Sequence, residues 1–288
     1  MSDAKRRGLV TVIGAGTMGA GIAQVCAGAG HEVFLVDVDA EALARGRAAI
    51  ESSLARFVDK GTIDQPAAAR TLSTIHTIGN LAAAVGAAEV VIEAVSEAID
   101  VKRSVWGQIA AHARPGTLLA TNTSSLSVTE IAGFGGNPAS TCGLHFFNPV
   151  PALPLVEVVR GERSSDATIE RAIAFVQDID KTPIVCRDTP GFIVNRLLIP
   201  YVNDAVHAFS ERVAQAKDLD AAMTLGANLP IGPLALADLI GLDVTLAAIE
   251  ALFAETSDPR FRPAPLLRRM VRAGKLGRKS GEGFHRYA

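Results

Sequence analysis

Short runs of β-branched and apolar residues alternate with longer, Ala-rich stretches over the first two thirds of the chain. The runs at 9–13, 32–37, 89–94, 117–122 and 183–188 predict strands. The stretches at 18–28, 40–60, 101–113 and 166–178 predict helices. Strands that alternate with helices are typical of a parallel sheet with helices on both faces. The pattern predicts an α/β, doubly wound sheet domain over residues 1–188.

The pattern changes after the helix-breaking pair Pro190-Gly191. Strand-like runs nearly end there, and apolar residues recur at helical spacing in the segments 192–212, 217–226, 233–254 and 265–273. We therefore expect an all-helical C-terminal domain over residues 189–288.

Composition excludes several classes of protein. A hydrophobic fraction of 49% supports a substantial core, and a net charge of −2 provides no basic surface for nucleic acid. The three cysteines, Cys26, Cys142 and Cys186, are far apart and form no CxxC pair. Reduced thiols in a cytoplasmic protein are the simplest interpretation, and no Cys/His cluster has the spacing of a metal site.

An uncharged run from residue 8 to residue 30 follows the basic triplet KRR and superficially resembles a signal peptide or a membrane span. The run contains seven glycines, which make a poor apolar helix. We therefore expect no membrane association.

The glycine spacing has a better explanation. Gly14-x-Gly16-x-x-Gly19 follows a predicted strand and opens a predicted helix, which is the arrangement that holds a dinucleotide pyrophosphate at a helix N-terminus. Asp37 ends the next strand, 18 residues after Gly19, where a carboxylate binds ribose hydroxyls and repels a 2′-phosphate. The sequence therefore favours NAD over NADP, while a glycine-rich turn without a ligand remains the alternative.

The stretch GLHFFNPVPALPLVEVV places His145 and Glu157 in an otherwise apolar segment. Neither Tyr201 nor Tyr287 has a lysine four residues on, which excludes a Tyr-x-x-x-Lys dehydrogenase. A strand that returns alongside the first would bring His145 to Glu157, so that the imidazole can act as a base and the carboxylate can orient it. A buried polar pair with a purely structural role is the alternative.

Seven motifs, in order along almost the whole chain, resemble the short-chain L-3-hydroxyacyl-CoA dehydrogenases, and most closely the bacterial 3-hydroxybutyryl-CoA dehydrogenases. They are GAGTMGAGIAQ, TLSTI, TNTSSLSVTEIA, GLHFFNPVPALPLVEVV, DTPGFIVNRLL, GPLALADLIGLD and LGRKSGEGFHRY. The resemblance implies a Rossmann-like NAD domain, a helical domain that forms a homodimer, and an acyl-CoA substrate between them. It implies reversible NAD-dependent oxidation of an L-3-hydroxyacyl-CoA, with a short acyl chain, to the 3-ketoacyl-CoA.

The resemblance also assigns roles to individual residues. His145 is the base, Glu157 orients it, Ser124 bonds the substrate oxygen beside the cofactor, and Asn195 holds acyl-CoA and nicotinamide. The expected cofactor contacts are Gly14, Gly16, Thr17, Met18, Gly19, Asp37, Glu97, Lys102, Ser124 and Asn148.

Arg56 and Lys60 on the predicted helix 40–60 are further candidates, for contact with the CoA phosphates, and two pairs of charged candidates keep an ordinary alternative. Glu97 and Lys102 could be a solvated helix pair. Arg56 and Lys60, which could meet CoA phosphates, could be a solvated basic face.

Three positions depart from the family pattern: Leu229 stands where histidine is usual, Ser96 where an apolar or aromatic residue is common, and His285 where tyrosine is more frequent. None belongs to the expected base, its partner or the phosphate loop, so they bear on acyl preference or domain packing. The sequence also permits two rival functions: a dehydrogenase of a free hydroxy acid on the same scaffold, and a non-catalytic NAD-binding relative.

Overall fold

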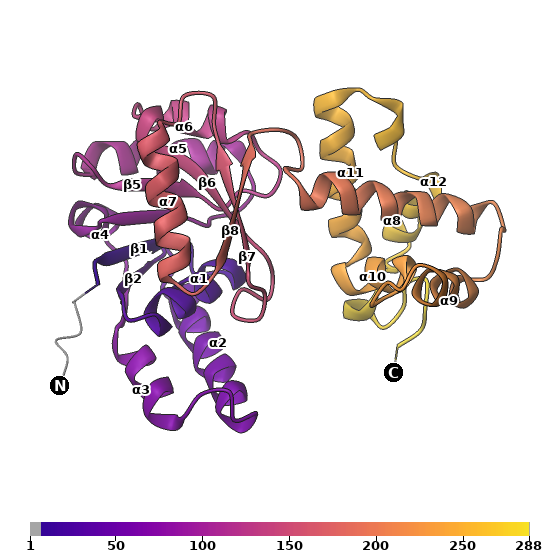
Figure 1. Cartoon of the computed structure of the whole chain (residues 1–288), viewed down its shortest axis with the longest axis horizontal. Helices are drawn as coiled ribbons and strands as arrows, with labels where there is room; N and C mark the ends of the chain where they lie inside the picture. Colours follow the sequence, from indigo (N-terminus) through magenta and orange to yellow (C-terminus); the bar gives the residue numbers. More distant parts are fainter. Residues whose placement is uncertain (1–6, 288) are drawn as a thin grey trace. The chain divides into compact units, whose positions relative to one another are not determined.

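The computed structural model describes residues 7–287 of the chain, which divides after Asp188 into two compact units (Figure 1). The first unit is built on one eight-stranded sheet with the strand order β3-β2-β1-β4-β5-β6-β7-β8. All neighbouring strands run parallel except β6 and β7, which are antiparallel. The strands are β1 (Leu9–Ile13), β2 (Glu32–Val36), β3 (Ile75–Ile78), β4 (Val90–Glu93), β5 (Leu118–Thr121), β6 (Thr141–Phe146), β7 (Leu155–Arg160) and β8 (Thr182–Arg187).

Helices cover both faces of this sheet, as the apolar pattern predicts. One face packs on α1 and α7 through a core that includes Ile22 and Val176, and the other packs on α4, α5 and α6 around the fully buried Trp106. The helices of this unit are α1 (Thr17–Gly28), α2 (Ala40–Asp59), α3 (Gln65–Ser73), α4 (Leu81–Ala87), α5 (Ile99–His112), α6 (Val128–Phe134) and α7 (Asp166–Asp178), with a short 3₁₀ turn, η1 (Pro138–Ser140).

Every element predicted for the first unit is present, with ends that differ by at most two residues. Four elements were not predicted: β3, α3, α4 and α6. Each has nine residues or fewer, which is too short to establish a clear period. β3 also carries the polar pair His76-Thr77, which interrupts its apolar run.

The second unit is helical. Its elements are α8 (Val194–Ser210), α9 (Ala216–Gly226), α10 (Pro233–Ile240), α11 (Leu242–Thr256) and α12 (Pro265–Arg272), with the 3₁₀ turns η2 (Pro259–Phe261) and η3 (Arg278–Ser280). The single helix predicted for 233–254 is wrong. Gly241 has a φ of +102°, a conformation that glycine adopts readily, and it separates α10 from α11.

Two carboxylates hold the C-terminal tail against this unit. Asp238 is buried and accepts hydrogen bonds from the backbone N–H groups of Phe284 and His285 and from the Tyr287 hydroxyl. Asp220 lies 2.7 Å from Nε2 of His285. The family departure at His285 is therefore a packing contact of the tail.

No helix in the described part of the chain is both long enough and apolar enough to cross a bilayer.

Candidate active site

The carboxyl ends of five neighbouring strands form the edge on which most of the predicted site residues lie. The strand register places Ile13, Val36, Glu93, Thr121 and Gly143 in one row across β1, β2, β4, β5 and β6. The strand order reverses between β1 and β4, and ligands of open α/β sheets bind at such a reversal, beyond the carboxyl ends of the strands. The glycine motif, Asp37, Glu97, Ser124 and His145 all lie just beyond this row.

The glycine motif has the geometry of a phosphate loop. Gly14 has a φ of +106°, and a Cβ on it would lie 2.5 Å from the carbonyl oxygen of Ala94. A Cβ on Gly19 would lie 1.8 Å from the carbonyl oxygen of Gly14, so α1 packs closely on β1 only with glycine there. Nothing lies within 4 Å of a Cβ built on Gly16, which is the N-cap of α1 and leads to a first turn with Thr17 exposed and Met18 half-buried. The open N-terminus of this helix can therefore receive an anion.

Asp37 lies directly against this loop. Its Oδ2 accepts the N–H of Ala15 at 2.8 Å, and its Oδ1 accepts the N–H of Asp39 at 3.0 Å. A half-buried carboxylate at the end of β2 is thus fixed beside the phosphate loop, in the position that suits ribose hydroxyls. These residues fit NAD.

His145 and Glu157 are brought together by the antiparallel pairing of β6 and β7, in which they face each other directly. Nδ1 of His145 lies 2.6 Å from Oε2 of Glu157, and the carboxyl group is fully buried. Because a carboxylate only accepts hydrogen bonds, Nδ1 carries the proton and Nε2 carries the lone pair of the neutral ring. The pair can therefore act as a base with a fixed tautomer.

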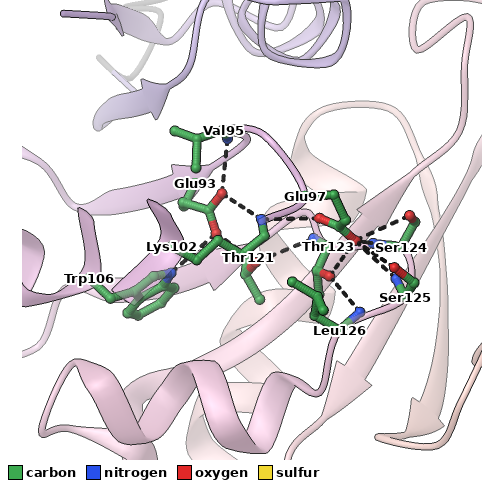
Figure 2. Close-up of polar contacts among 10 residues, drawn as sticks. All are labelled: Glu93, Val95, Glu97, Lys102, Trp106, Thr121, Thr123, Ser124, Ser125 and Leu126. Atoms are coloured by element: carbon green, nitrogen blue, oxygen red, sulfur yellow. Dashed lines mark hydrogen bonds and ion pairs between the residues drawn. The ribbon is translucent and has the colours of Figure 1, made fainter. Parts of the chain in front are cut away.

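Ser124, Glu97 and Lys102 form one polar network after β4 and β5 (Figure 2). Oε1 of Glu97 accepts the Ser124 N–H at 2.7 Å and the Ser124 hydroxyl at 3.2 Å, while Oε2 lies 3.3 Å from Nζ of Lys102. Lys102 is only 1% exposed, so the alternative of a solvated helix pair is wrong.

Burial by itself would raise the pKa of Glu97. The ammonium of Lys102 and the hydrogen bonds from Thr123, Ser124 and Ser125 outweigh that effect and hold the pKa below its ordinary value. Glu97 is therefore ionised at neutral pH, and it contributes a fixed negative charge at the edge of the sheet.

The remaining predicted residues belong to other segments of the chain. Asn148 is exposed in the turn between β6 and β7. Arg56 and Lys60 are exposed at the far end of α2, which extends away from the sheet (Figure 1). Asn195 belongs to the second unit, where it lies half-buried in the first turn of α8.

The thiol nearest to His145 in sequence is not activated. Cys142 is fully buried in β6, and burial raises its pKa to about 12, so it stays protonated at neutral pH. Among the described residues, no group of His, Cys, Asp and Glu side chains could hold a metal ion.

One prominent residue of the site was not predicted from the sequence. Glu93 ends β4 and is fully buried, and its carboxylate accepts four hydrogen bonds from the surrounding network. The available signal was a carboxylate inside the apolar run EVVIEA, at the strand end that faces the reversal of strand order.

Comparison with known proteins identifies the family to which the chain belongs. Residues 9–189 match the model of the NAD binding domain of 3-hydroxyacyl-CoA dehydrogenase, and residues 191–287 match the model of its C-terminal domain. The chain belongs to the 3-hydroxyacyl-CoA dehydrogenase family. It is therefore an NAD-dependent oxidoreductase, and the predicted fold class, a Rossmann-like sheet domain followed by a helical domain, is confirmed.

Members of the 3-hydroxyacyl-CoA dehydrogenase family resemble the chain over nearly its whole length. A Deinococcus radiodurans protein named "Probable 3-hydroxybutyryl-CoA dehydrogenase" is 45% identical over 276 residues, covering 96% of this chain and 99% of the relative. The mitochondrial hydroxyacyl-coenzyme A dehydrogenase of Sus scrofa is 42% identical over 284 residues, covering 96% and 90%. The crystal structure of (S)-3-hydroxybutyryl-CoA dehydrogenase from Ralstonia eutropha superposes with a TM-score of 0.93 at 42% identity, covering 97% and 99%.

Proposed function

We propose that the chain oxidises a short-chain L-3-hydroxyacyl-CoA to the 3-ketoacyl-CoA, with His145 as the base. Nε2 of His145 takes the hydroxyl proton, while the hydrogen on the same carbon leaves as hydride. Bound NAD supplies the acceptor for that hydride. The observation that carries this proposal is the 2.6 Å contact between Nδ1 of His145 and the buried Glu157, which stabilises the imidazolium that forms.

Two neutral polar side chains complete the proposed site. Ser124, next to Glu97 beyond β5, bonds the substrate oxygen and stabilises the charge that develops on it once its hydroxyl hydrogen turns from Glu97 to that oxygen. Asn195 holds the acyl-CoA near the nicotinamide, to which Asn148 also contributes. Neutral groups suit this task because they do not compete with His145 for the proton.

The cofactor preference rests on Asp37. Asp37→Ala is expected to raise the KM for NAD by about 10–100-fold, because charged hydrogen bonds to the ribose hydroxyls are lost, and to reduce discrimination against NADP. Initial rates with NAD and NADP measure both effects. Asp39→Ala is the matched control, since it removes the N-cap of α2 two residues later and should change stability but not cofactor preference. An unchanged NAD/NADP ratio in Asp37→Ala would show that another group contacts the ribose.

We propose that Arg56 and Lys60 contact the phosphates of the CoA moiety. The double variant Arg56→Ala/Lys60→Ala is expected to raise the KM for acetoacetyl-CoA about 3–10-fold, because exposed ion pairs contribute up to ~1 kcal/mol each, and to leave the KM for NADH unchanged. Arg70→Ala, at an exposed position on α3, is the control for loss of basic charge. A KM for acetoacetyl-CoA equal to that of Arg70→Ala would contradict the contact.

The preference for a short acyl chain is supported by relatives named 3-hydroxybutyryl-CoA dehydrogenase. Initial rates across acyl-CoAs of increasing length, together with free acetoacetate, test the proposed substrate class. We expect kcat/KM to be highest for the four-carbon acyl-CoA and far lower for acetoacetate, because binding energy from the CoA handle positions the reacting carbon. Equal efficiency with free acetoacetate would favour a hydroxy acid dehydrogenase instead.

We also propose that the chain is cytoplasmic and forms a homodimer. The homodimer is supported by large apolar side chains that stay at least half exposed on the second unit: Leu197, Val213, Leu225, Leu239 and Val244. Sedimentation analysis that finds only monomers at micromolar concentration would contradict the dimer.

A further inference from the structure

Glu93 combines complete burial with an unusually full set of hydrogen bonds. Its Oε1 accepts the N–H of Val95 at 2.9 Å and Nζ of Lys102 at 2.8 Å. Its Oε2 accepts Nε1 of Trp106 at 3.2 Å and the hydroxyl of Thr121 at 2.8 Å. These donors come from β5, α5 and the turn after β4, so a single carboxylate joins three segments at the edge of the site (Figure 2).

Lys102 links Glu93 to Glu97. Its ammonium group bridges Glu93 and Glu97, with contacts of 2.8 Å and 3.3 Å, and the side chain is almost fully buried. A buried charge needs a well-placed partner, because solvent cannot replace that partner. The position of Lys102, and through it that of Glu97, therefore depends on Glu93.

Glu97 in turn holds the loop that follows β5. In addition to both donors of Ser124, its Oε1 accepts the Thr123 hydroxyl at 2.6 Å and the Ser125 N–H at 3.0 Å. The loop that carries Ser124 is thus wrapped around one carboxylate oxygen. Displacing Glu97 would move several donors together, and with them the Ser124 hydroxyl.

The turn held by Glu93 also touches the phosphate loop. The backbone of Ala94 and Val95 fills the space beside Gly14, where a Cβ would lie 2.5 Å from the Ala94 carbonyl oxygen and 3.0 Å from the Val95 nitrogen. Glu93 therefore connects the two loops between which cofactor and substrate would meet.

We propose that Glu93 is a positioning residue for the reaction, which acts through Lys102 and Glu97 to fix the hydroxyl of Ser124 at the substrate oxygen. The inference rests on the proposed role of Ser124. A purely structural role of Glu93 makes a different prediction. Loss of Glu93 would then lower stability, and its effect on kcat would not depend on whether Ser124 is present.

The test is a double-mutant cycle on kcat for 3-hydroxybutyryl-CoA oxidation in the full chain, with Glu93→Gln and Ser124→Ala. Glu93→Gln keeps the side-chain shape and removes the charge that holds Lys102. We expect Glu93→Gln alone to lower kcat about 10–100-fold, since small displacements of a positioning group have effects of that order. In the Ser124→Ala background, the same substitution should lower kcat by no more than about threefold, because coupled residues are not additive.

Thr11→Val is the matched control. Thr11 is fully buried in β1 of the same sheet, and its hydroxyl donates to the carbonyl oxygen of Ala84, away from the Ser124 loop. This variant should lower the melting temperature and leave kcat unchanged in both backgrounds.

Equal kcat losses from Glu93→Gln in both backgrounds would overturn the inference, as would a lowered melting temperature with unchanged kcat. Full turnover in Ser124→Ala alone would contradict the proposed role of Ser124 and remove the basis of the inference. Those results are distinguishable, because the first two leave the Ser124→Ala defect in place.

A milder variant keeps the inference testable if Glu93→Gln does not fold. Trp106→Phe removes one donor to Glu93 and retains the carboxylate and an aromatic ring. It should lower kcat about 2–5-fold, and this loss should disappear in the Ser124→Ala background. A loss that persists there would overturn the inference as well.

Discussion

Replacing His145 with glutamine is expected to lower turnover by about 10²–10⁴-fold, or roughly 3–5 kcal/mol in the activation barrier. Glutamine is close in size to histidine and keeps polar atoms, but its amide cannot accept the proton of the substrate hydroxyl. NAD affinity should stay nearly unchanged, because the phosphate loop and Asp37 follow β1 and β2, which are separated from β6 by β4 and β5 in the sheet. Steady-state kcat and an NAD binding titration measure the two quantities.

The same unit offers a matched control for the loss of a buried histidine. His31 is also buried and also pairs with a carboxylate, with Nε2 2.9 Å from Oδ2 of Asp178, but it lies before β2, away from the site. His31→Gln should lower stability and leave turnover per folded molecule intact. If His145→Gln retained wild-type turnover, a different group would have to be the base.

Glu157→Gln is expected to lower turnover by about 10²–10³-fold, an effect of the same kind as the loss of the carboxylate from a catalytic triad. The amide can still contact Nδ1, but it carries no charge to stabilise the imidazolium and can face the ring with its NH₂ group. Because Glu157 is fully buried, water cannot replace the lost charge. Turnover of Glu157→Gln and Glu157→Asp, each normalised to folded protein, checks this expectation.

Partial recovery is expected in Glu157→Asp, which restores the charge at a greater distance from the ring. A Glu157→Gln enzyme within about threefold of wild type would show that Glu157 serves folding alone. A variant that loses stability but not turnover would support the same conclusion.

The sequence predicted the parts of the site that depend on chain order and simple periodicity. In a parallel sheet, the residues that follow successive strands share one edge, so Gly14 and Asp37 could be grouped before their positions were known, whereas Ser124 was assigned by the family resemblance. The contact between His145 and Glu157 was predictable as well, because twelve residues with prolines in the middle allow a hairpin-like return.

Other features depend on tertiary packing and were missed. The sequence left a solvated helix pair open for Glu97 and Lys102, and only the fold shows that Lys102 is buried between Glu93 and Glu97. Gly241 carries an apolar helical pattern on both sides, so its positive φ and the break between α10 and α11 were not visible in the sequence. The burial of Lys102 and the break at Gly241 depend on the tertiary context, which the local sequence pattern does not contain.

The most direct measurement of the role of His145 is a crystal structure of the protein with NAD and acetoacetyl-CoA bound. We predict that Nε2 of His145 lies within about 2.6–3.2 Å of the 3-keto oxygen, while Nδ1 remains on Glu157. A structure in which that oxygen contacts other groups and Nε2 lies out of hydrogen-bond reach would contradict the assignment of His145 as the base.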